Sequence, residues 1–170
     1  MKYQARSIKG KLYDKKRNRL LSDVVTVTYP DLELLSETFR GAGINGEIDL
    51  PTYGQFGSLV IEISHNGLSE DIIKTFRQEH RQYEHRWASQ VLNSTGATEI
   101  VGKKVIFEGY PKKLGIGSIE PNKAEESSTA VEVTYMKYSI GNDVVFELDK
   151  LNDKFVVGGV DYSAALNAVL

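Results

Sequence analysis

The 170-residue sequence contains no cysteine. Structural disulfides, zinc sites built from thiolates and catalysis by a cysteine nucleophile are therefore excluded. Long apolar runs are missing as well, since no segment approaches the about 18 apolar residues of a membrane helix. The first residues also lack the apolar region of a signal peptide. We therefore expect a protein without membrane insertion that is made and assembled in a reducing cytoplasm.

Histidine is scarce, and the spacing of the three histidines argues against a metal site. His80 and His85 are five positions apart, which turns them about 500° on a helix and removes them from a shared face. His65 falls in a turn beside Asn66 and Gly67. We expect no metal ligands and no metal cofactor.

Catalytic motifs are missing too. There is no P-loop, and Gly57-Ser58-Leu59 lacks the glycine pattern of a nucleophile elbow. Gly41, Gly43 and Gly46 have the G-x-G-x-x-G spacing of a dinucleotide site, but the residues that follow alternate and stop at Pro51. They cannot open the helix whose N-terminus would bind the pyrophosphate. We therefore predict no enzyme, no catalytic residues and no cofactor, and assign the three glycines to a tight hairpin turn.

Charge is present but unevenly distributed. The net formal charge is −2, yet residues 2–19 carry eight Lys and Arg against Asp14, a local balance of +7 that leaves −9 for the remainder. The cluster Lys15–Arg19 fits a nucleic-acid arm, a solvated loop or a contact to an acidic partner. We favour the latter two, because no aromatic stacking residues alternate with these charges.

Alternation of polar and apolar residues dominates the sequence and predicts antiparallel strands. In one such run Trp87 falls on the apolar side, as expected for a core residue or a subunit contact. Two helices are expected, Glu70–His80 with Ser69 as N-cap, and a short one within 162–170 that must pack on the sheet or on a neighbour. The predicted strands are Val24–Thr28, Gln55–Ser64, Tyr83–Leu92, Lys103–Glu108, Thr129–Ile140 and Val144–Leu148.

These elements predict a mainly β protein: a sandwich or barrel of antiparallel strands in one domain, residues 1–170, with one flanking helix and a short C-terminal helix. The strand Thr129–Ile140 carries polar residues on both faces. A sheet that covers a core over part of its length and faces water in a lumen elsewhere has this pattern, and so does an extended surface sheet of a monomer.

Two windows of the sequence resemble the major tail tube proteins of contractile phage tails and related phage-tail-like bacteriocins. The first runs from Tyr29-Pro30 through the Gly-rich turn to Asp49, and the second is 149–161, with its Leu-Asn strand and Gly-Val-Asp turn before a short apolar helix. The resemblance implies a tail-tube fold and rings, hexameric in that family, whose inward strands merge into one barrel and which stack into a tube.

The resemblance also implies partners and sites. We expect contacts with sheath, tape-measure and baseplate proteins, and passage of DNA, an effector or ions through the lumen of a phage or phage-tail-like particle. The glycine turns with Asp161 are expected to serve hairpins and assembly, and acidic residues to face the lumen. The turn residues are Gly41, Gly43, Gly46, Gly158 and Asp161; the lumen acids are Glu37, Glu47, Asp49 and Glu132. The alternative is a monomeric β-barrel module that binds nucleic acid or an acidic partner through the basic loop Lys9–Arg19.

Overall fold

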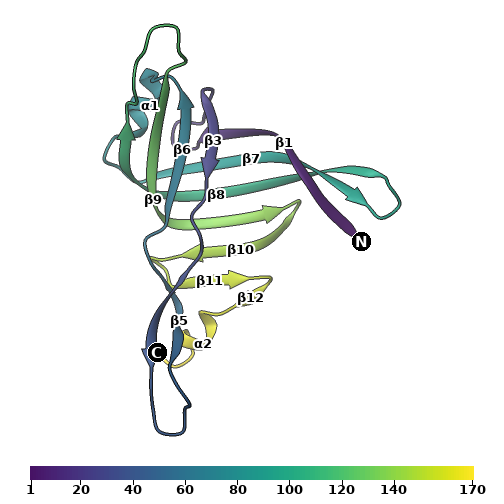
Figure 1. Ribbon diagram of the computed structural model, residues 1–170, viewed down its shortest axis with the longest axis vertical. Helices are drawn as coiled ribbons and strands as arrows, with labels where there is room; N and C mark the ends of the chain where they lie inside the picture. The colour runs from purple at the N-terminus through teal and green to yellow at the C-terminus, as the bar shows by residue number, and fades with distance from the viewer.

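The computed structural model describes residues 1–170, apart from the side chain of Ala5. Antiparallel strands make up most of it, and the two helices are short (Figure 1). In chain order the elements are β1 (Lys2–Asp14), β2 (Arg19–Leu21), β3 (Val24–Thr28), β4 (Leu34–Phe39), β5 (Ile48–Phe56), β6 (Val60–Asn66), α1 (Glu70–Thr75), β7 (Arg81–Asn93), β8 (Thr98–Gly115), β9 (Glu126–Ile140), β10 (Asp143–Asp149), β11 (Lys154–Val157), β12 (Val160–Asp161) and α2 (Ala164–Asn167).

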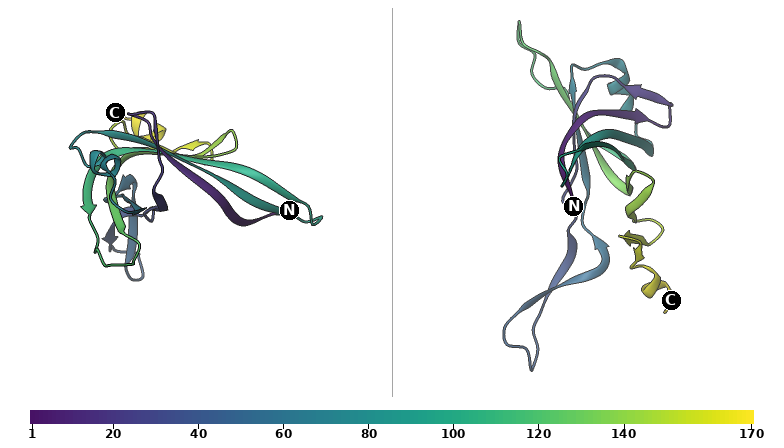
Figure 2. Two further views of the ribbon diagram at one scale, coloured as in Figure 1. Left: turned by 90° about the horizontal axis from the view of Figure 1, so that it is seen from above. Right: turned by 90° about the vertical axis from the view of Figure 1, so that its right-hand side faces the viewer.

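Strand β9 connects two layers of sheet. Along one edge it pairs with β8, whereas along the other it pairs first with β6 and then, from Tyr135 to Ile140, with β10. The order β3-β6-β9-β8 forms the first layer, called here the four-stranded sheet. The order β2-β1-β7-β8-β9-β10-β11-β12 forms the second layer, called the long sheet. Figures 1 and 2 show that the strands of the two layers cross steeply.

The hydrophobic core fills the space between these layers. Ile61, Ile63 and Val133 of the four-stranded sheet belong to one buried cluster with Tyr83 and Phe107 of the long sheet. The predicted alternation of β7 is confirmed, because Tyr83, Ser89 and Val91 are buried on one face. Trp87 packs against the cluster, with its ring stacked on that of Tyr138. Its prediction as a core residue is therefore confirmed.

The four-stranded sheet has two free edges. Strand β3 pairs only with β6, and β8 loses β7 as a partner after Gly109, so that Tyr110–Gly115 pairs only with β9. Pro111 lies in this part of β8, and proline is confined to edge strands because it has no N–H to donate. Each free edge exposes backbone donors and acceptors that can pair with another chain.

Strands β4 and β5 form a separate two-stranded ribbon that projects from the body of the molecule (Figure 1, bottom). Gly41–Gly46 lies in the loop at its tip, so the predicted hairpin is confirmed, although the connection from Arg40 to Glu47 is longer than a tight turn. Gly43 and Gly46 have positive φ, whereas Gly41 does not. Glycine is thus required conformationally at two of the three positions.

Several expected boundaries are wrong. The run Gln55–Ser64 is not one strand, because Gly57-Ser58-Leu59 separates β5 from β6. Helix α1 keeps the Ser69 cap but ends at Thr75 rather than at His80. The C-terminal helix is reduced to α2, in which no side chain is buried. Its neighbour Tyr162 nevertheless contacts the aromatic rings of the β5 and β11 region.

Candidate assembly surfaces and channel face

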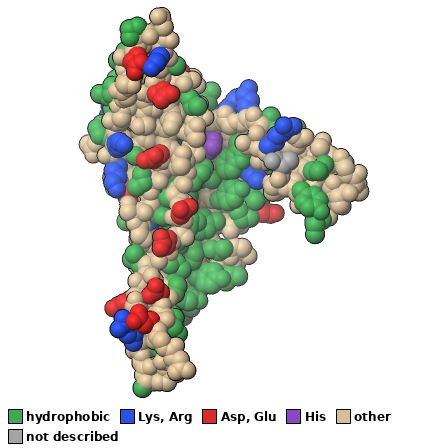
Figure 3. Space-filling view, viewed as in Figure 1, with side chains coloured by type: hydrophobic (Ala, Val, Ile, Leu, Met, Phe, Trp, Pro, Cys, Tyr) green, Lys and Arg blue, Asp and Glu red, His purple; other side chains and the backbone are tan. Residues whose placement is uncertain are grey.

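The outer face of the four-stranded sheet, turned away from the core, is polar. Residues directly across neighbouring strands share a face, so the register places Thr28, Glu62, Ala130 and Lys113 in one row across β3, β6, β9 and β8. The alternating partners Ile61 and Ile63 point into the core. This polar outer face continues down the molecule toward the β4–β5 ribbon, and Figure 3 shows acidic side chains at intervals along that side.

Glu132 lies on this face, among the predicted lumen acids. Its carboxylate accepts hydrogen bonds from Ser58 Oγ at 2.9 and 2.7 Å and pairs with Lys112 Nζ at 3.1 Å. Partial burial opposes its ionisation, but the contacts with Ser58 and Lys112 outweigh that effect and hold the pKa of Glu132 below its ordinary value. Glu132 therefore stays ionised near neutral pH.

The other three predicted acids lie on the β4–β5 ribbon. Asp49 accepts a hydrogen bond from Thr38, its cross-strand partner, at 2.8 Å. Glu37 pairs instead with Leu50 and so faces the opposite side of the ribbon. Glu47 forms an ion pair with Arg40 at 2.6 Å near the tip. The four acids therefore do not share one surface, because Glu37 and Asp49 lie on opposite faces.

Glu62 is an acidic residue that the sequence prediction missed. It is exposed on β6 beside Thr28, on the same outer face as Glu132. The signal was present in the sequence, because Glu62 is the polar member of the alternating run Leu59–Ser64. The four predicted acids, Glu37, Glu47, Asp49 and Glu132, did not include it.

The second glycine turn is a tight one. Gly158 and Gly159 connect β11 to β12 with φ values of 58° and 84°, the pair of positive angles that two-residue hairpin loops favour. Asp161 follows, and its Oδ1 accepts hydrogen bonds from the backbone N–H and the hydroxyl of Ser163. These hydrogen bonds lower the pKa of Asp161. Turn geometry accounts for these residues, and any role in assembly stays a prediction.

The basic N-terminal segment is a hairpin rather than a loop, since β1 and β2 pair on either side of 15–18. Arg19 and Arg17 pair with Asp71 at 2.9 and 3.7 Å, and Lys16 pairs with Glu79 at 2.6 Å. Residues 15–18 form an exposed turn, as expected for a solvated loop, and their cations pair with acids around α1. Binding of an external acidic or nucleic-acid partner by this cluster would have to compete with those pairs.

A buried ion pair holds this hairpin in place. Arg81 and Asp14 are almost fully buried, and Arg81 Nη1 donates to Asp14 Oδ2 at 3.1 Å. The second guanidinium nitrogen donates to the Lys74 carbonyl and to Glu79, both at 2.6 Å. Breaking such a pair on one side leaves a buried charge uncompensated, which costs about 3–5 kcal/mol. The arrangement fixes α1 against the end of β1.

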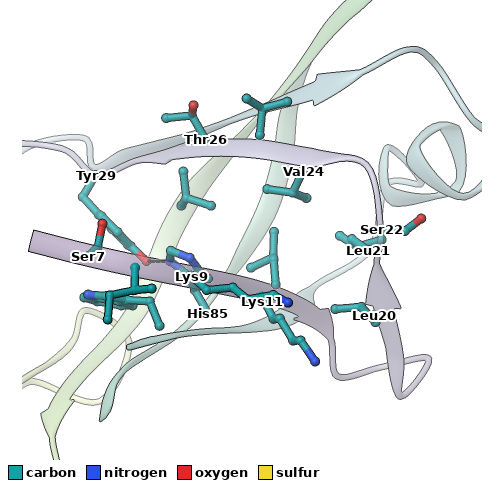
Figure 4. A pocket seen from close by; sticks show the side chains of 16 residues that line it. Ser7, Lys9, Lys11, Leu20, Leu21, Ser22, Val24, Thr26, Tyr29 and His85 are labelled. Carbon is teal, nitrogen blue, oxygen red and sulfur yellow. Dashed lines mark hydrogen bonds between the residues drawn. The ribbon is translucent and has the colours of Figure 1, made fainter. Parts of the chain in front are cut away.

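A cavity of about 590 Å³ lies between β1 and β3, which do not pair (Figure 4). Among its lining residues, the Tyr29 hydroxyl lies 2.6 Å from Nδ1 of His85. Burial lowers the pKa of His85 and raises that of Tyr29. Apart from Lys9 and Lys11, the other lining side chains carry no formal charge when His85 is neutral.

The described residues were also searched for metal-binding groups and membrane-spanning helices. No group of three or more His, Asp or Glu side chains within them is arranged to hold a metal ion. None of the helices has the length and apolar composition needed to cross a membrane.

Sequence comparisons relate this chain to known proteins. A family model described as phage tail tube protein FII matches residues 10–170. The chain is 28% identical over 139 residues to the tail tube protein of Escherichia phage P2, with 80% of each chain covered.

Two solved structures are also similar. One is a chain of an extracellular contractile injection system, the PVC sheath–tube complex in the extended state. It has a TM-score of 0.53 and 13% identity, over 77% of this chain and 88% of that one. The other belongs to the anti-feeding prophage baseplate, with a TM-score of 0.48 and 12% identity, over 79% and 96% of the two chains.

Proposed function

Because the chain belongs to the phage tail tube protein FII family, we propose that it forms rings in which the four-stranded sheets of neighbouring protomers join into one channel wall. Membership of that family makes it a structural subunit of a contractile tail tube. The observation that supports ring closure is the pair of free edges, one on β3 and one on the Tyr110–Gly115 part of β8.

Strand direction makes these two edges complementary. Every pairing in the order β3-β6-β9-β8 is antiparallel, so strand direction alternates across the four strands. Cyclic symmetry keeps all protomers in the same orientation. The edge of β8 in one protomer therefore meets β3 of the next in an antiparallel sense. Closing the ring in this way removes every exposed edge of the wall.

The size of the ring determines whether a channel remains. Six protomers would supply about 24 strands, more than the 16–18 strands that already leave an aqueous channel in porins. The polar outer face, with Glu62 and Glu132, would line that channel, because the apolar face is occupied by the core. Ionised carboxylates on the wall would let DNA or an acidic cargo slide, since cationic walls bind phosphates strongly.

The partners follow from the position of a tube inside a contractile particle. We extend the proposal to a sheath around the ring stack, a baseplate and a tape-measure protein, with assembly in the bacterial cytoplasm. The role is structural and needs no catalysis. The monomeric binding module is the weaker alternative, because the cations at the tip of the β1–β2 hairpin pair within the chain.

Edge pairing can be tested by disulfide cross-linking, because the natural chain has no cysteine. Thr28 and Lys113 lie at the two ends of one row, three strand spacings or about 14 Å apart in a single chain. That separation exceeds the 4.4–6.8 Å between Cα atoms of a disulfide. We expect oxidised Thr28→Cys/Lys113→Cys protein to give a ladder of covalent oligomers that ends at a closed ring on non-reducing gels.

Two matched variants complete the test. Thr26→Cys/Lys113→Cys samples a register shifted by two residues, and each single cysteine variant can form dimers at most. Tubes in negative-stain electron microscopy without a ladder from either double variant would disprove pairing of β3 with β8. A monodisperse monomer at high protein concentration, with neither rings nor tubes, would disprove the tube assembly itself.

A further inference from the structure

The outer face of the long sheet carries a row of cations. Lys11 on β1, Arg86 on β7 and Lys104 on β8 are direct cross-strand neighbours. Their direction is fixed by Gly10, because a Cβ built there would point at the His85 and Trp87 side chains on the core side. The residues on either side of Gly10 therefore face outward. Lys9 extends the group by one row.

Most of this charge is uncompensated within the chain. Arg86 forms an ion pair with Glu84, but no salt bridge joins Lys9, Lys11 or Lys104 to a carboxylate among the described side chains. Like charges directly opposite on neighbouring strands are destabilising. The isolated fold therefore bears an electrostatic cost that a negatively charged partner would remove.

A groove runs beside the cation row. In the row next to it, Ala88 and Gly102 leave a low floor because their side chains are small, and Lys9 stands at the end of that row on β1. A cavity of about 580 Å³ lies there, bordered by the cations and by the β9–β10 turn at Gly141 and Asn142. Small floor residues beside a row of cations suit an elongated, anionic segment.

In the proposed ring, this groove lies on the outer wall, because the four-stranded sheet on the other side of the core faces the channel. We infer that the groove binds an acidic helical segment of the protein that surrounds the tube, an inference that rests on the proposed tube function. Three cations on adjacent strands span about 10 Å. Carboxylates at positions i, i+4 and i+7 of a helix span about 10.5 Å.

Nucleic acid fits this surface less well. The Tyr13 ring is covered by the Arg86 guanidinium, 5.5 Å from the ring centroid, and so offers no free stacking face. Sequence-independent binding of single strands relies on such aromatic platforms.

The test uses a fluorescein-labelled, alanine-based helical peptide with Glu at i, i+4 and i+7, and a peptide with Gln at those positions. Fluorescence anisotropy is measured on assembled tubes and on dissociated protein. We expect the Glu peptide to bind at least tenfold tighter than the Gln peptide, with affinity that falls as salt rises. Lys11→Glu/Lys104→Glu should reduce binding of the Glu peptide at least tenfold.

The control variant Arg77→Glu/Lys123→Glu makes the same change in net charge at exposed positions away from the groove and should bind like the natural protein. Lys11→Gln/Lys104→Gln, which only removes charge, should also lose binding and guards against misfolding of the reversed variant. Equal binding by all variants, or preferential capture of a labelled DNA duplex at this groove, would overturn the inference. Absence of tubes from the natural protein would count against the tube function alone, because peptide binding is also measured on dissociated protein.

Discussion

At the scale of single residues, Gly109 is the position where β8 leaves β7 and its free edge begins. A Cβ added there would lie 1.9 Å from the Glu132 carbonyl oxygen and 3.1 Å from Val133 Cα. Backbone would have to shift, and overpacking of this kind costs about 1–3 kcal/mol. We expect Gly109→Ala to lower the free energy of unfolding in urea by that amount. Gly102→Ala is the matched control, because a Cβ there meets nothing within 4 Å; an equal loss in both variants would contradict this explanation.

Residue-level predictions from the sequence succeeded where alternation alone decides burial. Trp87 belongs to a long alternating strand, and its burial followed from its neighbours. The Asp14–Arg81 pair could not be predicted in this way, because the two residues are 67 positions apart and meet only when β1 and β7 pair. In the predicted strand Val24–Thr28, a bulge between Val24 and Thr26 interrupts the alternation and puts Val24 on the core side with Val27.

At the scale of elements, the β4–β5 ribbon has an apolar face that is exposed to solvent in the single chain. Phe39, Ile48 and Leu50 share one face, together with Glu37, and are at least half exposed. An apolar face of this kind marks an interaction site, and we predict that a neighbouring subunit binds there. We expect replacement of Glu37–Leu50 by an Asn-Gly turn between the paired Ser36 and Pro51 to change the unfolding free energy by less than about 0.5 kcal/mol while abolishing tubes in electron microscopy.

A second variant separates loss of the apolar face from loss of the loop. Phe39→Ser/Leu50→Ser keeps the ribbon length and should also prevent tube formation. Tubes formed at the natural yield by both variants would show that the ribbon does not mediate assembly. A large loss of stability in the shortened chain would show that it supports the core.

The elements that the sequence predicted well are those with a buried face. Strands β7, β9 and β10 were located because their apolar residues alternate, and the Ser69 cap located the start of α1. Strand β1 was missed, since its residues 2–11 are exposed or basic apart from Ala5, whose side chain is not described. Sheet pairing, rather than local pattern, makes that segment extended. The break between β5 and β6 was missed for a related reason. Apolar residues recur on both sides of the break, so the pattern does not show where the chain leaves the core.

At the scale of the whole molecule, the sequence indicated a sandwich but not the layer crossing of β9. The polar residues on both faces of β9 were expected for a sheet that faces a lumen over part of its length or for a surface sheet of a monomer, and the structure adds that the partner of β9 changes along its length. Which partner lies at each half depends on β6 and β10, which come from distant parts of the chain. The candidate channel face was therefore predictable as a type of surface. The residues that belong to this face, Glu62 among them, could be identified only from the pairing register of the strands.

Acid sensitivity is also a property of the whole fold, because two histidines are held away from water on both sides of the core. His65 Nε2 lies 2.9 Å from Thr129 Oγ1 in the four-stranded sheet. Nδ1 of His85, on β7 of the long sheet, lies 2.6 Å from the hydroxyl of Tyr29, which follows β3. Burial lowers the pKa of both, opposed at His65 by the nearby Asp23. At mildly acidic pH the two histidines therefore bind protons more readily in the unfolded chain than in the folded one. The free energy of unfolding is highest above about pH 6.5 and decreases as the pH falls below that value.

The expected loss is at most about 1.4 kcal/mol per pH unit for each histidine. Urea unfolding between pH 7.5 and 5.5 should show this slope in the natural protein and a smaller slope in His65→Gln/His85→Gln. Glu132 remains ionised throughout that window, because its contacts with Ser58 and Lys112 keep its pKa low despite partial burial, so carboxylate protonation there does not mimic the effect. His80→Gln provides the substitution control at an exposed histidine. If the double variant kept the full slope, the loss of stability at acidic pH would have to arise from groups other than His65 and His85. That result would contradict the prediction that these two histidines make the fold sensitive to acid.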